Sequence, residues 1–412
     1  MKTIALITEY NPFHFGHLYH LNEAKKISSA THSICIMSSS FVQRGEPAIV
    51  DKWSRAKMAI DSGVDLVIEL PFLSSVQTAE LFAYGSVRIL DELKTVDYLI
   101  FGSESGDLKT LQEIACVLCK EPYLYKKELK ENLKKGLSFP ISRNLAIANY
   151  FSNYYKFDIK DILNNANNIL AVEYLKALNK LSSNIKPLTI KRVGHGYNDL
   201  NISNSFNSAS AIRRAIFKNG LYENIDLVPE QTFFALEDFL KTHKNFNSIN
   251  NYYNVLNYKL ISSSKEELKK LYGITDGLEN RIIDKSFKSN SFEDLIGNIA
   301  SKSHTRSRIR RALLQFILNT TKDEIDAYFN SNTKYIRILG ANKKGFEIIN
   351  KIKKNSEIRV LTKFTDYNKF DELKNDISIK KEILATNMYY YGISQTEPII
   401  NADFTKSPYI TK

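Results

Sequence analysis

The first hundred residues alternate between short apolar runs and longer segments in which apolar side chains recur every three or four positions. Runs typical of buried strands occur at residues 2–8, 33–37, 65–70 and 98–101. Helical periodicity fills the segments between them, at residues 16–26, 51–62 and 78–93. This alternation predicts a parallel β-sheet with helices on both faces, which binds ligands at the carboxyl ends of its strands.

The pattern changes further along the chain. Residues 107–155, 169–181 and 208–218 are expected to be helical, and residues 187–192 form a further strand. Residues 226–321 are mainly helical in pattern, and strands return at 335–339 and 359–362 around a helix at 345–354. We therefore predict an α/β protein of three parts: a parallel-sheet domain over 1–220, a mainly helical, basic region over 221–330, and a small α/β appendage over 331–412.

Composition is that of a globular protein with room for more than one domain. The chain has 412 residues, of which 43% are hydrophobic and 25% charged. No stretch approaches the roughly 20 apolar residues of a membrane helix, so no membrane partner is expected. Cys35, Cys116 and Cys119 lie in apolar surroundings, which favours a reducing, cytoplasmic location. The oligomeric state is not predicted.

The net charge of +12 bears on which kind of partner the protein binds. A basic excess of this size favours a polyanion, with RNA ahead of a membrane surface. The alternative is that the lysines are solvated and reflect only a biased composition.

The segment directly after the first strand carries the chemistry, in His14-Phe15-Gly16-His17. Gly16 allows the backbone to approach a ligand closely, and the helix that starts there points free N–H groups at that ligand. Two histidines at this point can donate hydrogen bonds to phosphate oxygens and stabilise charge during phosphoryl-type transfer. The alternatives are structural histidines, or a metal site that includes His20. No carboxylate completes a zinc pattern, so no metal site is predicted.

A second segment supports an anion site. Ser208 and Ser210 stand at a helix start, where they can cap the helix, and Arg213 follows one turn later as a charged clamp. The alternative is an ordinary helix cap with a solvated arginine.

Both segments together resemble the HxGH nucleotidyltransferase superfamily, whose sheet is Rossmann-like. More specific segments narrow the resemblance to the bacterial tRNA(Met) cytidine acetate ligases. They occur in order at residues 9–14, 41–48, 65–72, 101–107, 167–170 and 303–308. The resemblance covers residues 1 to about 320. Phe15 departs from it, because asparagine is common between the two histidines of the family.

The resemblance implies an activity and a site. Such ligases join acetate to ATP, form acetyl-adenylate, and acetylate the exocyclic amine of the wobble cytidine in elongator tRNA(Met). Acetate is already ionised at neutral pH, so its attack needs no general base. His14 and His17 are the expected catalytic residues, and Mg²⁺ the expected ATP counter-ion. The expected ATP-binding residues are Ile7, Thr8, Glu9, Tyr10, Asn11, Pro12, Phe13, His14, Phe15, Gly16, His17, Leu18, Tyr19, His20, Gly102, Asn167, Asn168, Arg192, Ser208, Ser210 and Arg213.

Residues 303–318 have the pattern of an amphipathic helix whose polar positions are rich in arginine. Such a cluster suits phosphate binding, although a solvated helix surface is the alternative. The expected tRNA-binding residues are Arg44, Arg306, Arg308, Arg310 and Arg311.

Two other functions account for part of the sequence. A small-molecule adenylyltransferase would explain the histidine motif but not the additional helical residues. A non-catalytic RNA-binding protein would explain the charge but not the intact histidines. The residues that hold the acyl group are not predicted.

Overall fold

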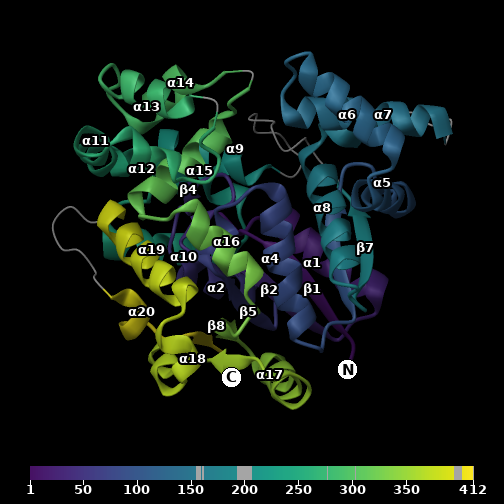
Figure 1. Cartoon of the computed structure of the whole chain (residues 1–412). Coiled ribbons are helices and arrows are strands. Elements are labelled where there is room, and N and C mark those ends of the chain that lie inside the picture. Colours follow the sequence, from purple (N-terminus) through teal and green to yellow (C-terminus); the bar gives the residue numbers. More distant parts are fainter. Residues whose placement is uncertain are drawn as a thin grey trace.

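The computed structural model describes residues 1–154, 159, 162–192, 207–275, 277–301, 303–393 and 401–411. A twisted sheet runs through the middle of the molecule, with helices on both sides (Figure 1). Its strands lie in the order β10-β8-β5-β2-β1-β6-β7, and β9 pairs with β8. Their bounds are β1 (Thr3–Thr8), β2 (His32–Ser38), β5 (Leu66–Leu70), β6 (Tyr98–Ser103), β7 (Lys186–Lys191), β8 (Tyr335–Ala341), β9 (Arg359–Leu361) and β10 (Tyr409–Ile410).

The order of the strands reverses at β1. From β1 the chain builds outward through β2 and β5 on one side, and then returns to place β6 and β7 on the other, with all of these pairs parallel. Such a reversal leaves a crevice at the carboxyl ends of the two central strands, here β1 and β6. The predicted parallel α/β architecture is confirmed, and it places the histidine segment at this crevice.

Helices cover both faces of the sheet and extend beyond it at one end. Their bounds are α1 (Phe15–Ser28), α2 (Lys52–Asp61), α3 (Phe72–Ser75), α4 (Ala79–Glu92), α5 (Leu108–Lys120), α6 (Tyr123–Lys134), α7 (Phe139–Tyr154), α8 (Ala166–Lys180), α9 (Ala209–Asn219), α10 (Glu230–His243), α11 (Tyr253–Ser262), α12 (Lys265–Lys269), α13 (Leu278–Ser286), α14 (Phe292–Ile299), α15 (Arg306–Ile317), α16 (Lys322–Asn330), α17 (Lys343–Asn355), α18 (Asp371–Lys374), α19 (Ile377–Ile393) and α20 (Ala402–Thr405). Within the part of the chain that the structure describes, none of them has the length and apolarity needed to span a bilayer.

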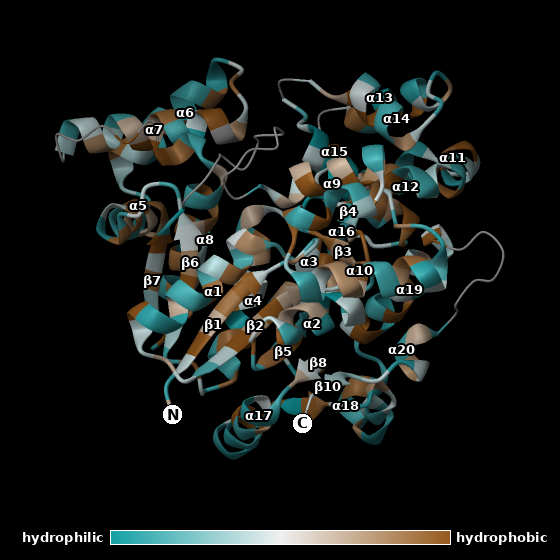
Figure 2. Cartoon of the chain, turned by 180° about the vertical axis from the view of Figure 1, so that it is seen from behind, coloured by the Kyte–Doolittle hydropathy of each residue, from teal (hydrophilic) through white to brown (hydrophobic). Residues whose placement is uncertain are grey.

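Each face of the sheet has its own apolar core. Helices α1, α2, α9 and α10 cover one face, where the core continues into the helical region from α11 to α16. Helices α4, α5, α8 and α17 cover the other face. Figure 2 shows the central strands in brown, flanked by helices with teal outer surfaces. Because the strands are buried on both faces, they are apolar along their whole length rather than alternating.

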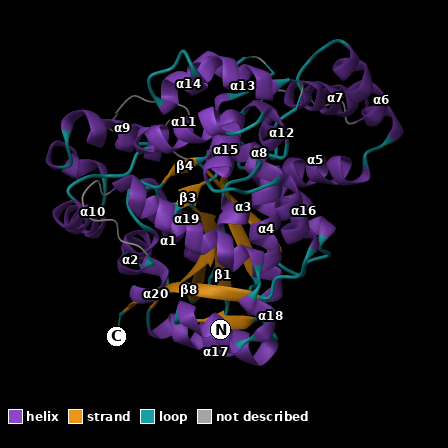
Figure 3. Cartoon of the chain, turned by 60° about the vertical axis from the view of Figure 1, so that its left-hand side comes forward, coloured by secondary structure: helices purple, strands orange, loops and turns teal. Residues whose placement is uncertain are grey.

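The C-terminal residues extend this sheet instead of forming the appendage that the sequence suggested. Strand β8 pairs antiparallel with β5, and β9 and β10 both pair with β8. Helices α17 and α18 lie beside β8 at the end of the molecule opposite α13 and α14 (Figure 3). Strands β5 and β8 are about 270 residues apart, and pairing over such a distance leaves no local pattern in a sequence. The sequence therefore suggested a separate region from residue 331 onward, whereas the sheet continues across that boundary.

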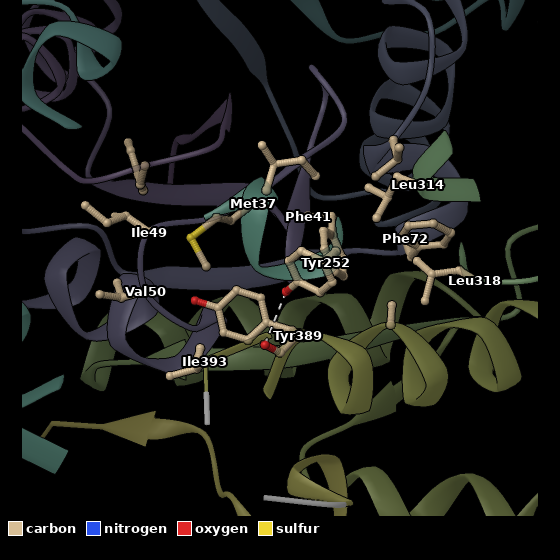
Figure 4. Packing of buried hydrophobic residues seen from close by; sticks show 14 of the residues in the cluster. Met37, Phe41, Ile49, Val50, Phe72, Tyr252, Leu314, Leu318, Tyr389 and Ile393 are labelled. Carbon is tan, nitrogen blue, oxygen red and sulfur yellow. Dashed lines mark hydrogen bonds between the residues drawn. The ribbon is translucent and has the colours of Figure 1, made fainter. Parts of the chain in front are cut away.

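Helix α19 fastens the C-terminal residues to the core of the first face. Tyr389 packs edge-on against Phe41 with ring centroids 6.1 Å apart, and Tyr252 packs against Phe41 at 5.7 Å (Figure 4). The Tyr252 hydroxyl donates to the backbone oxygen of Tyr389 at 3.3 Å. The helical region, the sheet and α19 therefore share one core.

A buried cluster of charges makes a second connection. Lys52 Nζ lies 2.5 Å from Glu69 Oε1, 3.0 Å from Glu382 Oε1 and 2.8 Å from Asp403 Oδ1, and all four side chains are at most 2% exposed. Arg337 Nη1 bridges Asp403 and Glu69 at 2.5 and 3.4 Å. Burial raises the pKa of Glu382, and the neighbouring Glu69 carboxylate acts in the same direction. Residues from the two ends of the chain therefore depend on each other for charge compensation.

Candidate active site

The turn between β1 and α1 is closed by its two histidines. His14 is the N-cap of α1, and its Nδ1 accepts a hydrogen bond from the backbone N–H of Gly16 at 3.0 Å. The backbone N–H of His14 donates to Nδ1 of His17 at 3.3 Å, which completes a reciprocal capping box. The spacing H-x-G-H therefore lets both histidine side chains bind the backbone at the start of α1.

These two bonds fix the tautomers of the imidazoles. A ring nitrogen that accepts a hydrogen bond carries no proton, so the neutral rings of His14 and His17 hold their protons on Nε2. The rings stack with centroids 3.7 Å apart and an angle of 25° between their planes. Each Nε2–H is thus available as a donor, while Nδ1 is occupied by the backbone.

Burial lowers the pKa of His14 to about 3, and the positive charges of Arg192 and Arg213 act in the same direction. Burial also holds the pKa of His17 well below its ordinary value, with His14 and Arg192 adding to the effect. Without a ligand both rings are uncharged at neutral pH. Phosphate oxygens placed beside them would raise both pKa values and strengthen the hydrogen bonds that the rings donate.

A pocket at the carboxyl ends of β1, β6 and β7 brings most of the predicted ATP-binding residues together. Its walls come from the β1–α1 turn, α8 and the start of α9. The predicted residues that line it are Ile7, Thr8, Glu9, Tyr10, Asn11, His14, Gly16, His17, Tyr19, His20, Gly102, Asn167, Arg192, Ser208, Ser210 and Arg213.

Other predicted residues are absent from the lining of this pocket. Phe13 is fully buried and packs edge-on against Tyr10 with ring centroids 4.7 Å apart. Phe15 is 40% exposed on the outside of the turn. Asn168 is buried, and its Oδ1 accepts from the backbone N–H of Ser105 at 3.1 Å. Their positions indicate that they shape the turn and the β6–α5 loop. Pro12 and Leu18 complete the set outside the lining.

The start of α8 is anchored by Glu104. Its Oε1 accepts from Asn167 Nδ2 at 2.6 Å, and its Oε2 accepts from the backbone N–H of Asn168 at 2.8 Å. Asn167 Oδ1 in turn accepts from Arg192 Nη1 at 3.4 Å. A Cβ atom on Gly102 would lie 3.3 Å from Arg192 Cγ, so glycine leaves room for this arginine beside the pocket. The chain of contacts positions a cation at the edge of the cavity.

Arg213 also lies at the pocket, but with partners that the sequence did not indicate. Its Nη1 donates to the backbone oxygen of Asn11 at 2.8 Å, and its Nη2 pairs with Glu46 Oε1 at 2.9 Å. Ser208 caps α9 by accepting from the backbone N–H of Ala211 at 3.2 Å. The arginine therefore ties the β1–α1 turn to the hairpin of β3 (Phe41–Val42) and β4 (Glu46–Pro47).

Sequence reasoning missed the apolar part of the lining and the hairpin residues. Gln43 and Glu46 follow the second strand at the ligand edge of the sheet, inside a segment that carried the family resemblance, and Leu170 stands inside another such segment. Phe82 and Tyr174 were indistinguishable from ordinary core positions of their helices. The full set of missed lining residues is Gln43, Glu46, Phe82, Phe101, Leu170, Tyr174, Ile190, Lys191, Asn207 and Ala209.

The arginines of α15 are largely engaged by the protein itself. Arg306 Nη2 and Arg310 Nη2 lie 2.8 and 2.7 Å from the two carboxylate oxygens of Glu293. Arg308 Nε donates to the backbone oxygen of Gly273 at 2.8 Å.

The start of α15 is also packed against the hairpin that carries Arg44. Arg311 Nη1 donates to the backbone oxygen of Gln43 at 3.4 Å. Gly45 has a φ of +77°, and a Cβ atom there would lie 2.6 Å from the backbone nitrogen of Arg311. The close approach brings Arg44 and Arg311 together, and contact of these arginines with RNA stays a prediction.

A doubly wound sheet, a helix start at its switch point and two imidazoles with inward donors define the class of protein. These features are those of an α/β enzyme that binds a nucleotide by its phosphates and transfers a group at phosphorus.

The chain belongs to the HIGH nucleotidyl transferase family, whose profile matches residues 1–401. Within it the chain belongs with the tRNA(Met) cytidine acetate ligases, as the sequence resemblance predicted. It is 43% identical over 389 residues to the ligase of Thermoanaerobacter sp. (strain X514), covering 94% of this chain and 95% of that one. It is 41% identical over 415 residues to the ligase of Clostridium perfringens (strain ATCC 13124), covering all of both chains.

Solved structures also match this chain over its whole length. The apo crystal structure of Thermotoga maritima TmcAL matches with a TM-score of 0.94 and 34% identity, over 100% of this chain and 99% of that one. The same protein bound with alpha-thio ATP matches with a TM-score of 0.92 at the same identity and coverage.

Proposed function

We propose that this chain is an ATP-dependent ligase that activates acetate as acetyl-adenylate and acetylates the wobble cytidine of elongator tRNA(Met). The observation that best supports this activity is the pair of Nε2–H donors of His14 and His17 at the switch point of the sheet. The names of the relatives supply the substrate class, and the bound alpha-thio ATP of the Thermotoga maritima protein supports the nucleotide.

In the first step, a carboxylate oxygen of acetate forms a bond to the α-phosphorus of ATP. The bond from that phosphorus to the bridging oxygen breaks, and pyrophosphate leaves with the electron pair. The Nε2–H groups of His14 and His17, together with the nearby Arg192, stabilise the negative charge on the phosphate oxygens. No side chain has to remove a proton, because acetate is ionised at neutral pH.

In the second step, the exocyclic amine of cytidine attacks the carbonyl carbon of acetyl-adenylate. The bond from that carbon to the AMP oxygen breaks, AMP leaves, and the amine loses one proton to solvent or to AMP. The wobble base of an anticodon loop is unstacked, so its amine can enter a pocket that a duplex could not reach.

Mg²⁺ is the proposed counter-ion of ATP. Among the described residues, no group of three or more His, Cys, Asp or Glu side chains is placed to hold a metal ion. Mg²⁺ commonly binds substrate phosphates and water with few protein ligands, and it neutralises charge on ATP when bound. The cytoplasm, where tRNA is modified and thiols stay reduced, is the proposed location.

The test is acetyl transfer from labelled acetate to tRNA. Purified protein, ATP and labelled acetate are incubated with an elongator tRNA(Met) transcript, and with the same transcript carrying uridine at the wobble position. Label should enter only the cytidine transcript. Release of pyrophosphate with nicotinamide mononucleotide or phosphopantetheine, and no label in either RNA, would instead identify a small-molecule adenylyltransferase.

A further inference from the structure

The helical hairpin of α6 and α7 carries an unusual share of the apolar surface. Of the twenty-one large apolar side chains that are exposed among the described residues, seven lie on this hairpin. Exposed apolar side chains gathered on one hairpin mark an interaction site more often than scattered ones do. The seven are Tyr123, Leu124, Leu133, Phe139, Ile141, Leu145 and Tyr154.

Helix α6 adds a row of positive charge to this surface. Tyr123, Lys127, Lys130 and Lys134 recur at i, i+4, i+7 and i+11, so they share one face of the helix. Tyr123 is 78% exposed, whereas Tyr125, on the buried face, is 2% exposed. No ion pair joins these three lysines to another described residue, although Glu128 and Glu131 line the same groove as Lys127, whereas the arginines of α15 are paired directly with Glu293.

The chemistry of this face suits single-stranded or looped RNA. A row of ammonium groups attracts backbone phosphates, and exposed aromatic rings offer stacking surfaces to bases. Tyr150 and Tyr154 on α7 already stack on each other, with ring centroids 4.7 Å apart and 26° between their planes. An apolar partner protein would use the aromatic rings but would leave the lysine row uncompensated.

The hairpin is attached to the helix that lines the active site. Arg143 on α7 pairs with Glu173 on α8 at 2.8 Å, and Asn144 Nδ2 donates to the backbone oxygen of Leu163 at 3.1 Å. Asn167 and Leu170, near the start of α8, line the pocket. Figures 1 and 2 show α6 and α7 at the end of the molecule toward which the strands β1 and β6 run. The hairpin is therefore joined, through α8, to one wall of the pocket.

We infer that the face of α6 formed by Tyr123, Lys127, Lys130 and Lys134 docks the phosphate backbone and loop bases of the RNA substrate. The identity of that RNA as tRNA(Met) rests on the proposed function. The surface lies outside the arginine cluster that the sequence suggested, and its lysines have no ion pair with another of the described residues.

The test compares two charge reversals of equal size. One variant carries Lys127→Glu, Lys130→Glu and Lys134→Glu; the control carries Lys343→Glu, Lys353→Glu and Lys354→Glu on α17, at the opposite end of the molecule (Figure 3). Affinity for the tRNA(Met) transcript should fall about tenfold or more in the first variant, and the slope of affinity against salt should fall by about 2 to 3. The control should bind like the parent, and both should keep the acetate-dependent exchange of pyrophosphate into ATP.

Equal tRNA affinity of the two variants, whether both unchanged or both weakened, would overturn the inference. A triple change to glutamine at the same α6 positions removes the charge without reversing it, so it should weaken binding by less than the glutamate change does. This graded loss distinguishes an effect of charge from a folding defect. A parent protein that exchanges pyrophosphate but binds no tRNA would contradict the RNA part of the proposed function itself. Binding of the parent to phosphatidylserine vesicles but not to tRNA would reassign the surface to membranes.

Discussion

The histidine turn and helix α15 both present rows of nitrogen donors, and the structure uses them in opposite ways. In the turn, backbone N–H groups occupy Nδ1 of His14 and His17 and leave each Nε2–H for a ligand. In α15, Glu293 and a backbone oxygen occupy the guanidinium groups of Arg306, Arg310 and Arg308. The sequence shows how many donors a segment has, whereas only the fold shows whether the protein itself binds them or leaves them for a ligand.

The largest expected effect separates the two roles of His14. Asparagine in its place keeps an acceptor for the helix cap but removes the Nε2–H donor. His14→Asn should lower acetate-dependent pyrophosphate exchange by about 10²–10³-fold, the usual loss for one donor to a transition-state oxyanion. The thermal midpoint should stay close to that of the parent.

The matched control is His243→Asn on α10, outside the pocket lining, which should leave exchange unchanged. Full activity of His14→Asn would erase the contrast with α15, because the turn would then also be purely structural.

The next effect tests the structural side of the comparison. Arg310→Ala removes a partly buried guanidinium from Glu293, and should lower the free energy of unfolding by about 1–2 kcal/mol. Pyrophosphate exchange should be retained, because none of the described residues that line the pocket belongs to α15. Chemical denaturation measures the free energy of unfolding, and an exchange assay measures the retained activity. A loss of exchange without a loss of stability would mean that Arg310 serves a ligand.

The pH dependence of stability offers a smaller but specific signal. The folded pKa of His14 is about 3, below its unfolded value, so its share of stability is complete above about pH 6.5 and is lost as pH falls toward 3. The parent should therefore lose stability more steeply than His14→Asn between pH 6.5 and 5, by about 1 kcal/mol. Denaturation curves at several pH values measure it. Parallel pH profiles would show that the pKa of His14 is the same in the folded and unfolded states.

The smallest effect concerns the exposed arginine of the cluster. Arg306 is 52% exposed, and its pair with Glu293 is worth about 0.5 kcal/mol or less. Arg306→Ala should leave stability nearly unchanged and should weaken tRNA binding less than the lysine variant of α6. A weakening equal to that variant would restore α15 as an RNA surface, as the sequence alone suggested.

Local patterns in the sequence were sufficient for the first half of the fold. The apolar runs at residues 2–8 and 65–70 became β1 and β5, because parallel strands buried on both faces are continuously apolar. The insertion of β8 beside β5 could not be predicted, since it depends on pairing between distant segments. Helix α19 was missed because its apolar side chains surround the helix and give no clear amphipathic stripe.

The candidate site likewise has a local part that the sequence predicts and a long-range part that it does not. His14, Gly16 and His17 lie within four consecutive residues, so their joint action could be predicted from spacing alone. Glu46 meets Arg213 across 167 positions, and no pattern in the sequence marks that pair. The apolar walls from Phe82 and Tyr174 are equally invisible, because a residue that lines a pocket has the same periodicity as one that fills a core.

The position of Lys52 has a consequence for how this protein is made. Its ammonium group is fully buried, and one of its partners, Glu382, follows 330 positions later. During translation Lys52 and its neighbour Glu69 emerge long before Glu382 and Asp403, so the ammonium group first has a single carboxylate partner. Complete compensation of this charge therefore waits for the end of the chain, and a chain that stops before residue 382 lacks two of the three carboxylates around Lys52.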